Sequence, residues 1–395
     1  MSKKYRLGQM ILAAVNAAAI IGSVVLTVAG GHAAASQRTN YTAEHCSRDS
    51  EYDYGQVSCF FSKEAGFDRN SAENLKGQIY GDLKDASIVP AEGADIVHHA
   101  YSAEAGTAYV TCDMDGSSNA EITVAGGDFF LFRDFVLMSG SFFSDRDSLR
   151  DGAVIDKELA WQLYGSVNVE GKAIYVNDVE LYISGVIDTP STKPELKCTD
   201  DVPKAYITYD AAGMIFPSDH SYQWEEQEGR APEFSRVTCY ECAVPEPVEH
   251  FAYNSLNEHV YKVYKGNVSM VNNSERFLPK NRIKALKKLD RYIVRKDNII
   301  YPFWENASRI VEFKLSFIYG GRRLLLAIPL ITFICLLALA YRSFKRKKED
   351  LRKAAEKFFS SLRKKRREKK QKAEEIKEKS SEKESEQTKE SLNKK

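Results

Sequence analysis

Two long stretches of the chain contain no charged side chain. Residues 10–30 form a run of 21 uncharged, mostly apolar residues, and residues 324–341 form a second run of 18. A helix needs about 20 apolar residues to cross roughly 30 Å of hydrocarbon. Neither run shows the periodic charged positions of an amphipathic soluble helix. We therefore predict two transmembrane helices, at residues 10–30 and 322–341.

The region between them, residues 31–321, carries the periodicities of a mixed α+β domain. Near its start a strand, a helix and a strand follow one another at Gln56–Phe61, Ser71–Leu83 and Ile96–Tyr101. The same order recurs near its end at Arg236–Val244, Pro247–His259 and Val268–Val271. Two β-α-β units on either side of a central region indicate one split subdomain with another inserted at about residues 105–210.

The predicted insertion has shorter elements. Strands are expected at Thr107–Asp113, Glu121–Ala125, Ala153–Ile155 and Ala205–Tyr209, and a short aromatic helix at Asp128–Val136. Asp156 is a typical N-cap for a helix at Lys157–Tyr164, and Gly165 suits its C′ position. Asn177-Asp178 tolerates positive φ and predicts a two-residue hairpin turn between Ile174–Val176 and Val179–Ile183.

Charge is distributed unevenly, although the whole chain carries only +1. Residues 1–9 carry +3, residues 342–395 hold 22 basic and 11 acidic side chains, and residues 31–321 hold 29 basic and 44 acidic ones. Loops rich in Lys and Arg stay in the cytoplasm. We therefore expect a cytoplasmic N-terminus (1–9), an extracytoplasmic domain (31–321) and a basic cytoplasmic tail (342–395), partly disordered.

The first apolar run has an alternative interpretation as a signal peptide. Residues 31–36 contain an A-x-A pattern of the kind that signal peptidase cleaves. The run is longer than the usual apolar core of about 7–15 residues, which favours an uncleaved anchor. The orientation of the domain is the same in both cases.

Six of the seven cysteines fall in the predicted extracytoplasmic domain, and Cys335 falls in the second span. An even number in an oxidising compartment indicates disulfides. The candidates are Cys46, Cys59, Cys112, Cys198, Cys239 and Cys242. Cys46 with Cys59 is the local pairing to expect. Cys239 and Cys242 are also compatible with a redox pair or, with His250 and His259, a metal site, but a structural disulfide is favoured because the segment reads as a strand.

The central region resembles the extracytoplasmic core domain of MacB-type ABC transporter permeases, which are related to FtsX. The resemblance rests on four segments in order: GGDFFLFRDFVLMSGSFFSDRD (126–147), AVIDKELAWQLYG (153–165), VNVEGKAIYVNDVELYISGVID (167–188) and AYITYDAA (205–212). It covers about 31–321 and is clearest over 124–209. It implies a split α/β subdomain and a mixed insertion, joined by helices to a transmembrane stalk.

The chain departs from that family in three places. Ser141 stands where an Arg is usual, and the Pro before the Val-Gly-Lys phrase is replaced in the segment 168–172. Members of the family have three spans after the core, whereas this chain has one before its basic tail. We therefore expect a two-span variant that lacks the usual last two spans.

The resemblance implies a non-catalytic membrane subunit of an ABC-type export or mechanotransmission complex, in the plasma membrane of a bacterium. Its expected partners are a separate ABC ATPase, a multi-span permease subunit, or both. The alternative is a stand-alone, membrane-anchored extracytoplasmic binding protein without an ATPase. The basic tail predicts attraction to anionic lipid headgroups, with Leu351–Leu362 as a helix on the membrane surface or as a solvated charged helix. Nucleic acid is not expected as a partner.

The sequence does not favour an enzyme, and no cofactor or resident metal is expected. His98 and His99 are adjacent on a predicted strand and so point to opposite faces. Asp113 and Asp115 suit a turn better than a calcium site. The segment Gly165–Ala173 has five residues between its glycines instead of the four of a P-loop, and Ala173 replaces the hydroxyl that would hold magnesium.

Overall fold

The computed structural model describes residues 3–37, 40–48, 50–90, 93–144, 150–189, 192–216, 234–286 and 298–392. The chain divides into two units. Residues 22–323 form the folded domain with the adjoining parts of the two terminal helices, and residues 1–21 with 324–395 form the rest of those helices. The end of the segment 126–147, from residue 145 onward, lies outside the described residues.

The first half of the domain contains α1 (Lys3–Ala35), α2 (Thr42–Arg48), β1 (Tyr54–Phe61), η2 (Lys63–Ala65), α3 (Arg69–Asp85), β2 (His98–Cys112), β3 (Ser117–Gly127), η3 (Phe129–Phe132), β4 (Val136–Gly140), β5 (Gly152–Asp156), α4 (Lys157–Tyr164), β6 (Ala173–Val176) and β7 (Val179–Asp188). The second half contains η4 (Glu195–Lys197), β8 (Lys204–Ile207), α5 (Tyr209–Ile215), β9 (Cys239–Pro245), α6 (Phe251–Leu256), the π-helical turn η5 (Asn257–Tyr261), β10 (Val268–Asn272), α7 (Asn273–Arg276), α8 (Pro279–Ala285) and α10 (Phe303–Leu392).

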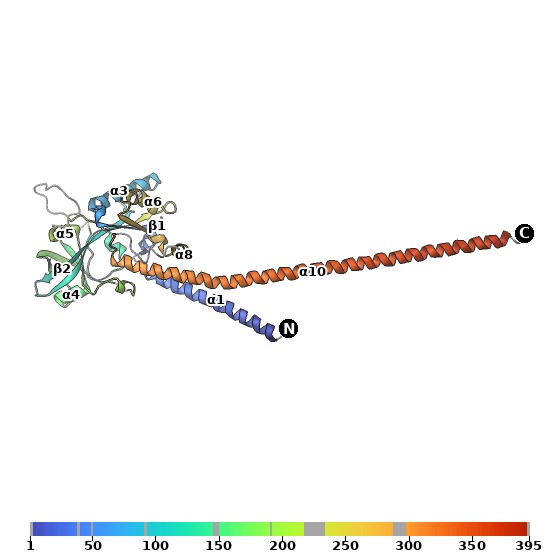
Figure 1. Ribbon diagram of the computed structural model, residues 1–395. Helices are drawn as coiled ribbons and strands as arrows, with labels where there is room; N and C mark the ends of the chain where they lie inside the picture. Colours follow the sequence, from blue (N-terminus) through green and yellow to red (C-terminus); the bar gives the residue numbers. More distant parts are fainter. Residues whose placement is uncertain are drawn as a thin grey trace. The chain divides into compact units, whose positions relative to one another are not determined.

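All ten strands belong to one mixed sheet in the order β10-β1-β9-β2-β3-β8-β5-β7-β4, with β6 paired to β2 and β7. The two predicted β-α-β units lie side by side in it, because β1 pairs with both β9 and β10. The 15-residue strand β2 joins this half to the strands of the insertion, since it pairs with β9, β3 and β6. The α+β class is thus confirmed, and the two predicted subdomains share a single sheet (Figure 1).

Alternating strand residues build two apolar layers, one on each face of the sheet. The first layer packs α3, α4, α5 and α6 against one face, through side chains such as Leu75, Leu159 and Leu256. The second layer holds η3 and the beginning of α10, through Phe129, Phe132 and Trp304. Phe143 is buried in the same layer, and Phe130, Phe135 and Phe142 are partly buried against it.

In the insertion, the structure confirms the predicted ends of one helix and one hairpin turn, and it contradicts one predicted helix. The Asp156 carboxylate accepts a hydrogen bond from the Leu159 amide at 2.8 Å, and Gly165 ends α4 with φ of 64°. Asn177 and Asp178 take the positive φ values of the predicted hairpin. The aromatic helix expected at 128–136 is instead a short 3₁₀ turn followed by β4, because β4 gains backbone partners on β7.

Two helices are long and apolar enough to cross a membrane. They lie at Arg6–Ala35, within α1, and Phe303–Arg367, within α10, with mean hydropathies of 2.3 and 2.6 in their most apolar windows. α10 continues through the predicted basic tail to Leu392, where the sequence predicted partial disorder. That stretch contains no Gly or Pro and is rich in Lys and Glu, both strong helix formers.

Candidate functional site

The first turn of α10 is fixed to the sheet by Arg133. This side chain is buried, forms an ion pair with Glu241 on β9, and donates to the Phe132 carbonyl oxygen at 2.7 Å. Its guanidinium lies 3.9 Å from the centre of the Trp304 ring on α10. A cation over a desolvated indole face is attracted by the ring quadrupole. Arg133 therefore ties α10 to the middle of the sheet.

A second arginine, Arg276 at the end of α7, lies between two carboxylates of α10. It forms two hydrogen bonds with Glu305, from Nη1 to Oε2 at 2.8 Å and from Nη2 to Oε1 at 3.1 Å. Its Nε donates to Glu312 Oε1 at 3.2 Å. Paired, parallel N–H donation to a carboxylate fixes direction as well as distance. The short helix α7 is thereby held in one register along α10.

Each carboxylate of α10 has a further arginine partner. Arg309 reaches Glu305 at 2.8 Å and Arg282 of α8 reaches Glu312 at 3.1 Å. Burial by itself favours the neutral form of Glu305, but Arg276 and Arg309 outweigh it and lower the pKa of that carboxyl. Burial likewise opposes the charge of Arg276, yet Glu305 and Glu312 raise its pKa above the ordinary value. Arg276 and Glu305 are therefore both ionised at neutral pH.

Hydrogen bonds connect the two arginines through the sheet. Asn273 accepts from Arg276 at 3.0 Å and donates to Ser58 Oγ on β1 at 2.7 Å. Ser58 donates to Glu241 at 3.0 Å, and Glu241 pairs with Arg133. Each of these side chains is buried. A continuous polar path thus crosses β1 and β9 below the beginning of α10.

The same group extends to the segment after α1. Arg276 Nη1 donates to Asn40 Oδ1 at 2.8 Å, and Asn40 Nδ2 donates to Ser308 Oγ on α10 at 2.8 Å. Ser308 in turn donates to Gln37 at 3.0 Å. The end of α1 and the beginning of α10 are therefore linked to each other as well as to the sheet.

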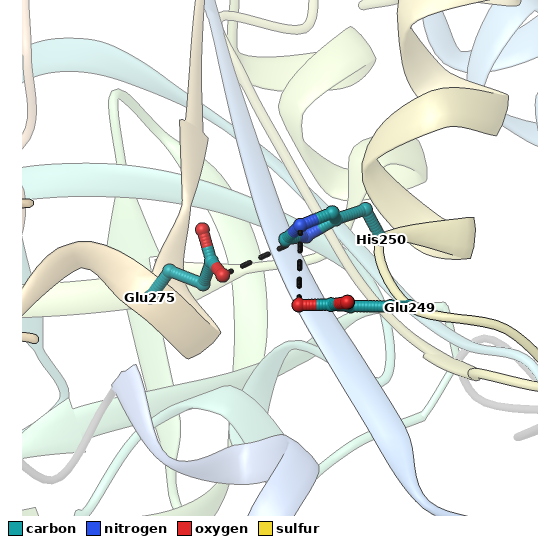
Figure 2. Close-up of side chains that lie close together, drawn as sticks. All are labelled: Glu249, His250 and Glu275. Carbon is teal, nitrogen blue, oxygen red and sulfur yellow. Dashed lines mark ion pairs between the residues drawn. The ribbon is translucent and has the colours of Figure 1, made fainter.

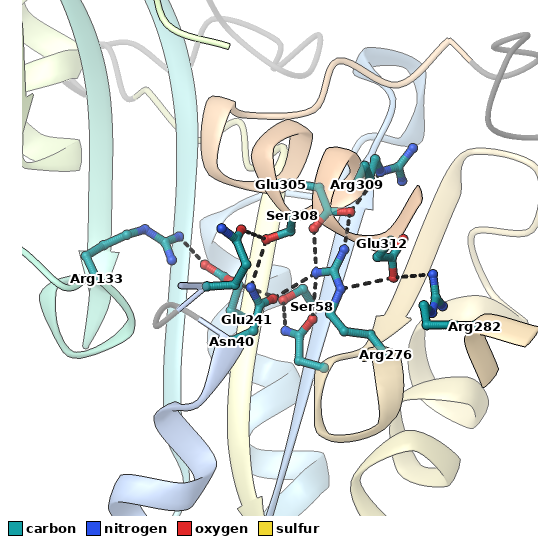
Figure 3. Close-up of polar contacts among 12 residues, drawn as sticks. Asn40, Ser58, Arg133, Glu241, Arg276, Arg282, Glu305, Ser308, Arg309 and Glu312 are labelled. Atoms are coloured by element: carbon teal, nitrogen blue, oxygen red, sulfur yellow. Dashed lines mark hydrogen bonds and ion pairs between the residues drawn. The ribbon is translucent and has the colours of Figure 1, made fainter. Parts of the chain in front are cut away.

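We call this connected set the junction network, and Figure 3 shows its contacts. Its members are Gln37, Asn40, Ser58, Arg133, Glu241, Asn273, Arg276, Arg282, Glu305, Ser308, Arg309 and Glu312. Buried ion pairs contribute little net stability, but breaking one leaves an uncompensated charge in the interior. Within residues 22–323, the network therefore bonds the end of α1 and the beginning of α10 to the sheet.

Below it, apolar contacts continue between the two helices. Val311, Leu315 and Tyr319 of α10 pack with Phe277, and Ala33 and Ala34 of α1 lie against them. A Cβ atom added at Gly30 would lie 2.9 Å from a ring carbon of Tyr319. α1 and α10 thus approach closely where a glycine leaves room.

Sequence reasoning missed the junction network. Sequence reasoning assigned no role to the charged residues that precede the second span. A signal was present: Glu305, Ser308 and Glu312 fall at helical spacing on the same side as Ala307, Val311 and Leu315. A helix stripe that mixes Glu and Ser with Leu and Val indicates a buried polar contact.

The structure does not confirm the predicted disulfides, since it joins none of the seven cysteines by a disulfide bond. The local pairing of Cys46 with Cys59 is wrong, because Cys59 lies in the first apolar layer and Cys46 packs against the second, across the sheet. Cys112 ends β2 and donates to the Leu163 carbonyl at 3.1 Å. Cys198 caps η4 and Cys335 is exposed on α10.

The redox and metal alternatives for Cys239 and Cys242 also fail. The two residues lie three positions apart on β9, so their side chains point to opposite faces, and they belong to different apolar layers. Both are fully buried, and burial is the main cause that raises their thiol pKa values. His250 and His259 do not complete a site with them: His259 pairs with Asp82 instead.

A cavity of about 560 Å³ opens beside the junction network. Arg276, Arg282 and Glu312 lie on its wall, together with His250, Asn254 and Glu275 from the elements that follow β9 and β10. The cavity is mixed in polarity and gives solvent access to the outer side of the network.

Comparison with known proteins gives a family. The sequence model of the MacB-like periplasmic core domain matches residues 13–231. Among solved structures, the extracellular domain of the noncanonic ABC-type transporter YknZ from Gram-positive bacteria is similar, with 13% identity, 55% of this chain and 100% of that chain covered, and a TM-score of 0.36. The periplasmic region of MacB from Actinobacillus actinomycetemcomitans is 15% identical over 60% of this chain and 92% of that chain, with a TM-score of 0.36. No curated protein matches the sequence.

Proposed function

The chain belongs to the family of proteins with a MacB-like periplasmic core domain, and from this premise we propose that it is a non-catalytic membrane subunit of an ABC-type export or mechanotransmission complex. In this role the domain moves or holds a partner outside the membrane. The energy comes from a separate ABC ATPase, since the described part of the chain offers no phosphate-binding loop of its own. A multi-span permease subunit is the second expected partner.

The observation that carries the proposal is the attachment of α10 to the domain. Arg276 holds Glu305 and Glu312, which lie about two helical turns apart on α10, and Arg133 stacks on Trp304 one residue before Glu305. The helix that enters the second apolar segment thus begins inside the domain, without a flexible linker. A continuous helix whose first turns are bonded to the sheet suits the transmission of motion better than simple anchoring.

We further propose the topology that charge predicts. Residues 10–30 and 322–341 span the plasma membrane of a bacterium, residues 31–321 lie outside, and both termini lie in the cytoplasm. The five basic side chains in 342–348 outweigh Arg322 and Arg323 on the other flank. The basic tail beyond them would lie close to anionic headgroups.

Co-purification tests the proposed complex. The tagged full chain is extracted from its native membrane in a mild detergent, with and without prior crosslinking, and the associated proteins are identified by mass spectrometry. An ABC ATPase or a multi-span permease should be recovered at a stoichiometric level. Recovery of neither, even after crosslinking, would contradict the proposal and favour a stand-alone binding protein, for which the cavity beside Arg276 is the candidate ligand site.

A further inference from the structure

Three potential metal ligands meet at the outer end of the cavity. Glu249 and His250 lie in the turn before α6, and Glu275 lies in α7 directly before Arg276. His250 Nε2 is 3.6 Å from Glu249 Oε1, and His250 Nδ1 is 3.7 Å from Glu275 Oε1. Candidate ligand atoms of the three residues all lie within 4.8 Å of one another. Figure 2 shows the imidazole beside the two carboxylates.

The spacing differs from that of hydrogen bonds. Hydrogen bonds between these groups would measure about 2.7–3.2 Å, and both distances are longer. Two ligands of a tetrahedral ion, each about 2.0–2.2 Å from it, lie roughly 3.3–3.6 Å apart. His250 Nδ1 and Glu275 Oε1 therefore have nearly the spacing of two ligands of one ion. Glu249 faces the other ring nitrogen, and its exposed side chain must rotate to join them as the third ligand.

Charge and local structure also favour a cation here. A third carboxylate, Glu246, is half-buried and lies within electrostatic reach of Glu275 and Glu249. The Asn281 amide donates to the Glu275 carbonyl oxygen at 3.1 Å and approaches its Oε2 at 3.4 Å, which leaves Oε1 directed at His250. Such an outer partner orients a ligand before the metal binds.

We propose that Glu249, His250 and Glu275 bind a divalent transition-metal ion of the zinc type on the outer side of the domain. One imidazole nitrogen and two carboxylate oxygens suit this class, whereas magnesium and calcium take oxygen ligands alone. Three protein ligands leave a coordination position for water from the cavity, so the ion is exchangeable. It joins the turn before α6 to α7, and so fixes the residue next to Arg276. This inference does not depend on the proposed transport role.

Metal binding to the full chain tests the site. The protein is purified in detergent, stripped with a chelator, and dialysed against zinc chloride, with bound metal measured by elemental analysis. The variants are His250→Asn, which tolerates the positive φ of that position, and Glu275→Gln, which keeps the shape of the side chain. His259→Ala is the matched control, because that histidine faces a single carboxylate, Asp82.

The expected result is one zinc ion fewer per chain in His250→Asn and Glu275→Gln than in wild type and His259→Ala. Zinc should also raise the melting temperature of wild type and not that of the two site variants, whose metal-free melting temperatures report their folding. Equal zinc binding by all four proteins would overturn the proposal. Substitution of cobalt for zinc gives a second readout. If the cobalt spectrum of His250→Asn still shows thiolate bands, the ion is bound by cysteines, and the proposal is overturned.

Discussion

Arg276 and Glu305 lie 29 positions apart in the chain and form a two-point ion pair in which only 2% and 3% of the side chains are exposed. The pair joins the helix that follows the edge strand β10 to the helix that continues towards the membrane. Both side chains are almost fully desolvated, although Arg276 also lines the cavity. The domain and α10 therefore separate only by breaking a desolvated ion pair.

Replacing Arg276 should destabilise the domain strongly. Arg276→Met keeps the length of the side chain but removes the positive charge that pairs with Glu305 and Glu312 in the interior. Removal of one member of a buried ion pair costs about 3–5 kcal/mol of folding free energy. We expect a clear fall in the melting temperature of the full chain in detergent, measured by tryptophan fluorescence or by heat-induced aggregation.

Arg352→Ala is the matched control for this variant. Arg352 also pairs with a glutamate, Glu356, at 3.2 Å, but both side chains are exposed on α10. Such i,i+4 surface pairs contribute about 0.3–0.5 kcal/mol. Equal effects of Arg276→Met and Arg352→Ala would show that the junction network is solvated and does not hold the helix.

The neighbouring glycines of α1 should respond in opposite directions to the same substitution. A Cβ at Gly30 would lie 2.9 Å from Tyr319, whereas one at Gly31 meets nothing within 4 Å. Gly31→Ala should stabilise the helix by up to about 1 kcal/mol, because alanine is the better helix former. Gly30→Ala must push the Tyr319 ring aside and should lower the melting temperature instead. If both variants shift it in the same direction, α1 and α10 do not meet at Gly30.

Local features of this fold are readable from the sequence because their causes are local. α4 begins directly after Asp156, whose carboxylate accepts a hydrogen bond from a backbone amide of the first turn. It ends directly before Gly165, which takes the left-handed backbone conformation. The aromatic run at 129–135 misled us for the opposite reason. Its periodicity fits a helix, but Val136 and Leu137 pair with β7, which lies about fifty residues later in the chain.

The junction network was beyond sequence reasoning for a similar reason. The four partners of Arg276 come from three segments: Asn40 after α1, Asn273 in its own helix α7, and Glu305 and Glu312 on α10. No short-range pattern connects these segments. The cysteines show the opposite error, in which closeness in the sequence suggested a bond that the fold does not make. Their even number suggested disulfides, but burial in two layers on opposite sides of a sheet separates Cys239 from Cys242 in spite of their proximity in sequence.

Thiol labelling should follow burial. We expect Cys46 and Cys198 of the native domain to react with a maleimide faster than Cys59, Cys239 and Cys242, which are fully buried with raised pKa values. After unfolding without reductant, all of them should react. Mass spectrometry of the labelled peptides measures both steps.

A thiol that reacts only after reduction would contradict this expectation and show a disulfide. Cys59 and Cys242 are the pair to examine first in that case, because they share one face of the adjacent strands β1 and β9, with Val57 opposite Cys242. Identical labelling with and without reductant would show that no disulfide forms, as in the structure.

The proposed topology predicts the behaviour of two fusions. Green fluorescent protein placed after residue 395 should fluoresce, because it stays in the cytoplasm with the basic tail. Alkaline phosphatase placed after Gly266, in the turn before β10, should be active, because that turn lies outside. The reverse result for both fusions would invert the orientation.

Acid should destabilise the domain through His99. This histidine is buried on β2, and burial, followed by the nearby charge of Lys76, lowers its pKa from 6.5 to about 4. Below pH 6.5 the unfolded chain binds a proton that folded His99 does not accept until about pH 4. The contribution of His99 to the free energy of unfolding is therefore complete above pH 6.5 and is lost as the pH falls to 4. At 1.4 kcal/mol per pKa unit, this loss is about 3 kcal/mol.

The variant His99→Gln isolates this contribution, since other carboxylates also titrate in acid. Melting temperatures of wild type and His99→Gln should be compared at pH 7 and pH 4.5. We expect the variant to lose less stability than wild type between the two pH values, because it has no proton to accept at this position. Parallel losses in the two proteins would mean that His99 is protonated in the folded domain, with Glu73, whose Oε1 lies 3.8 Å from its Nε2, as the counter-charge.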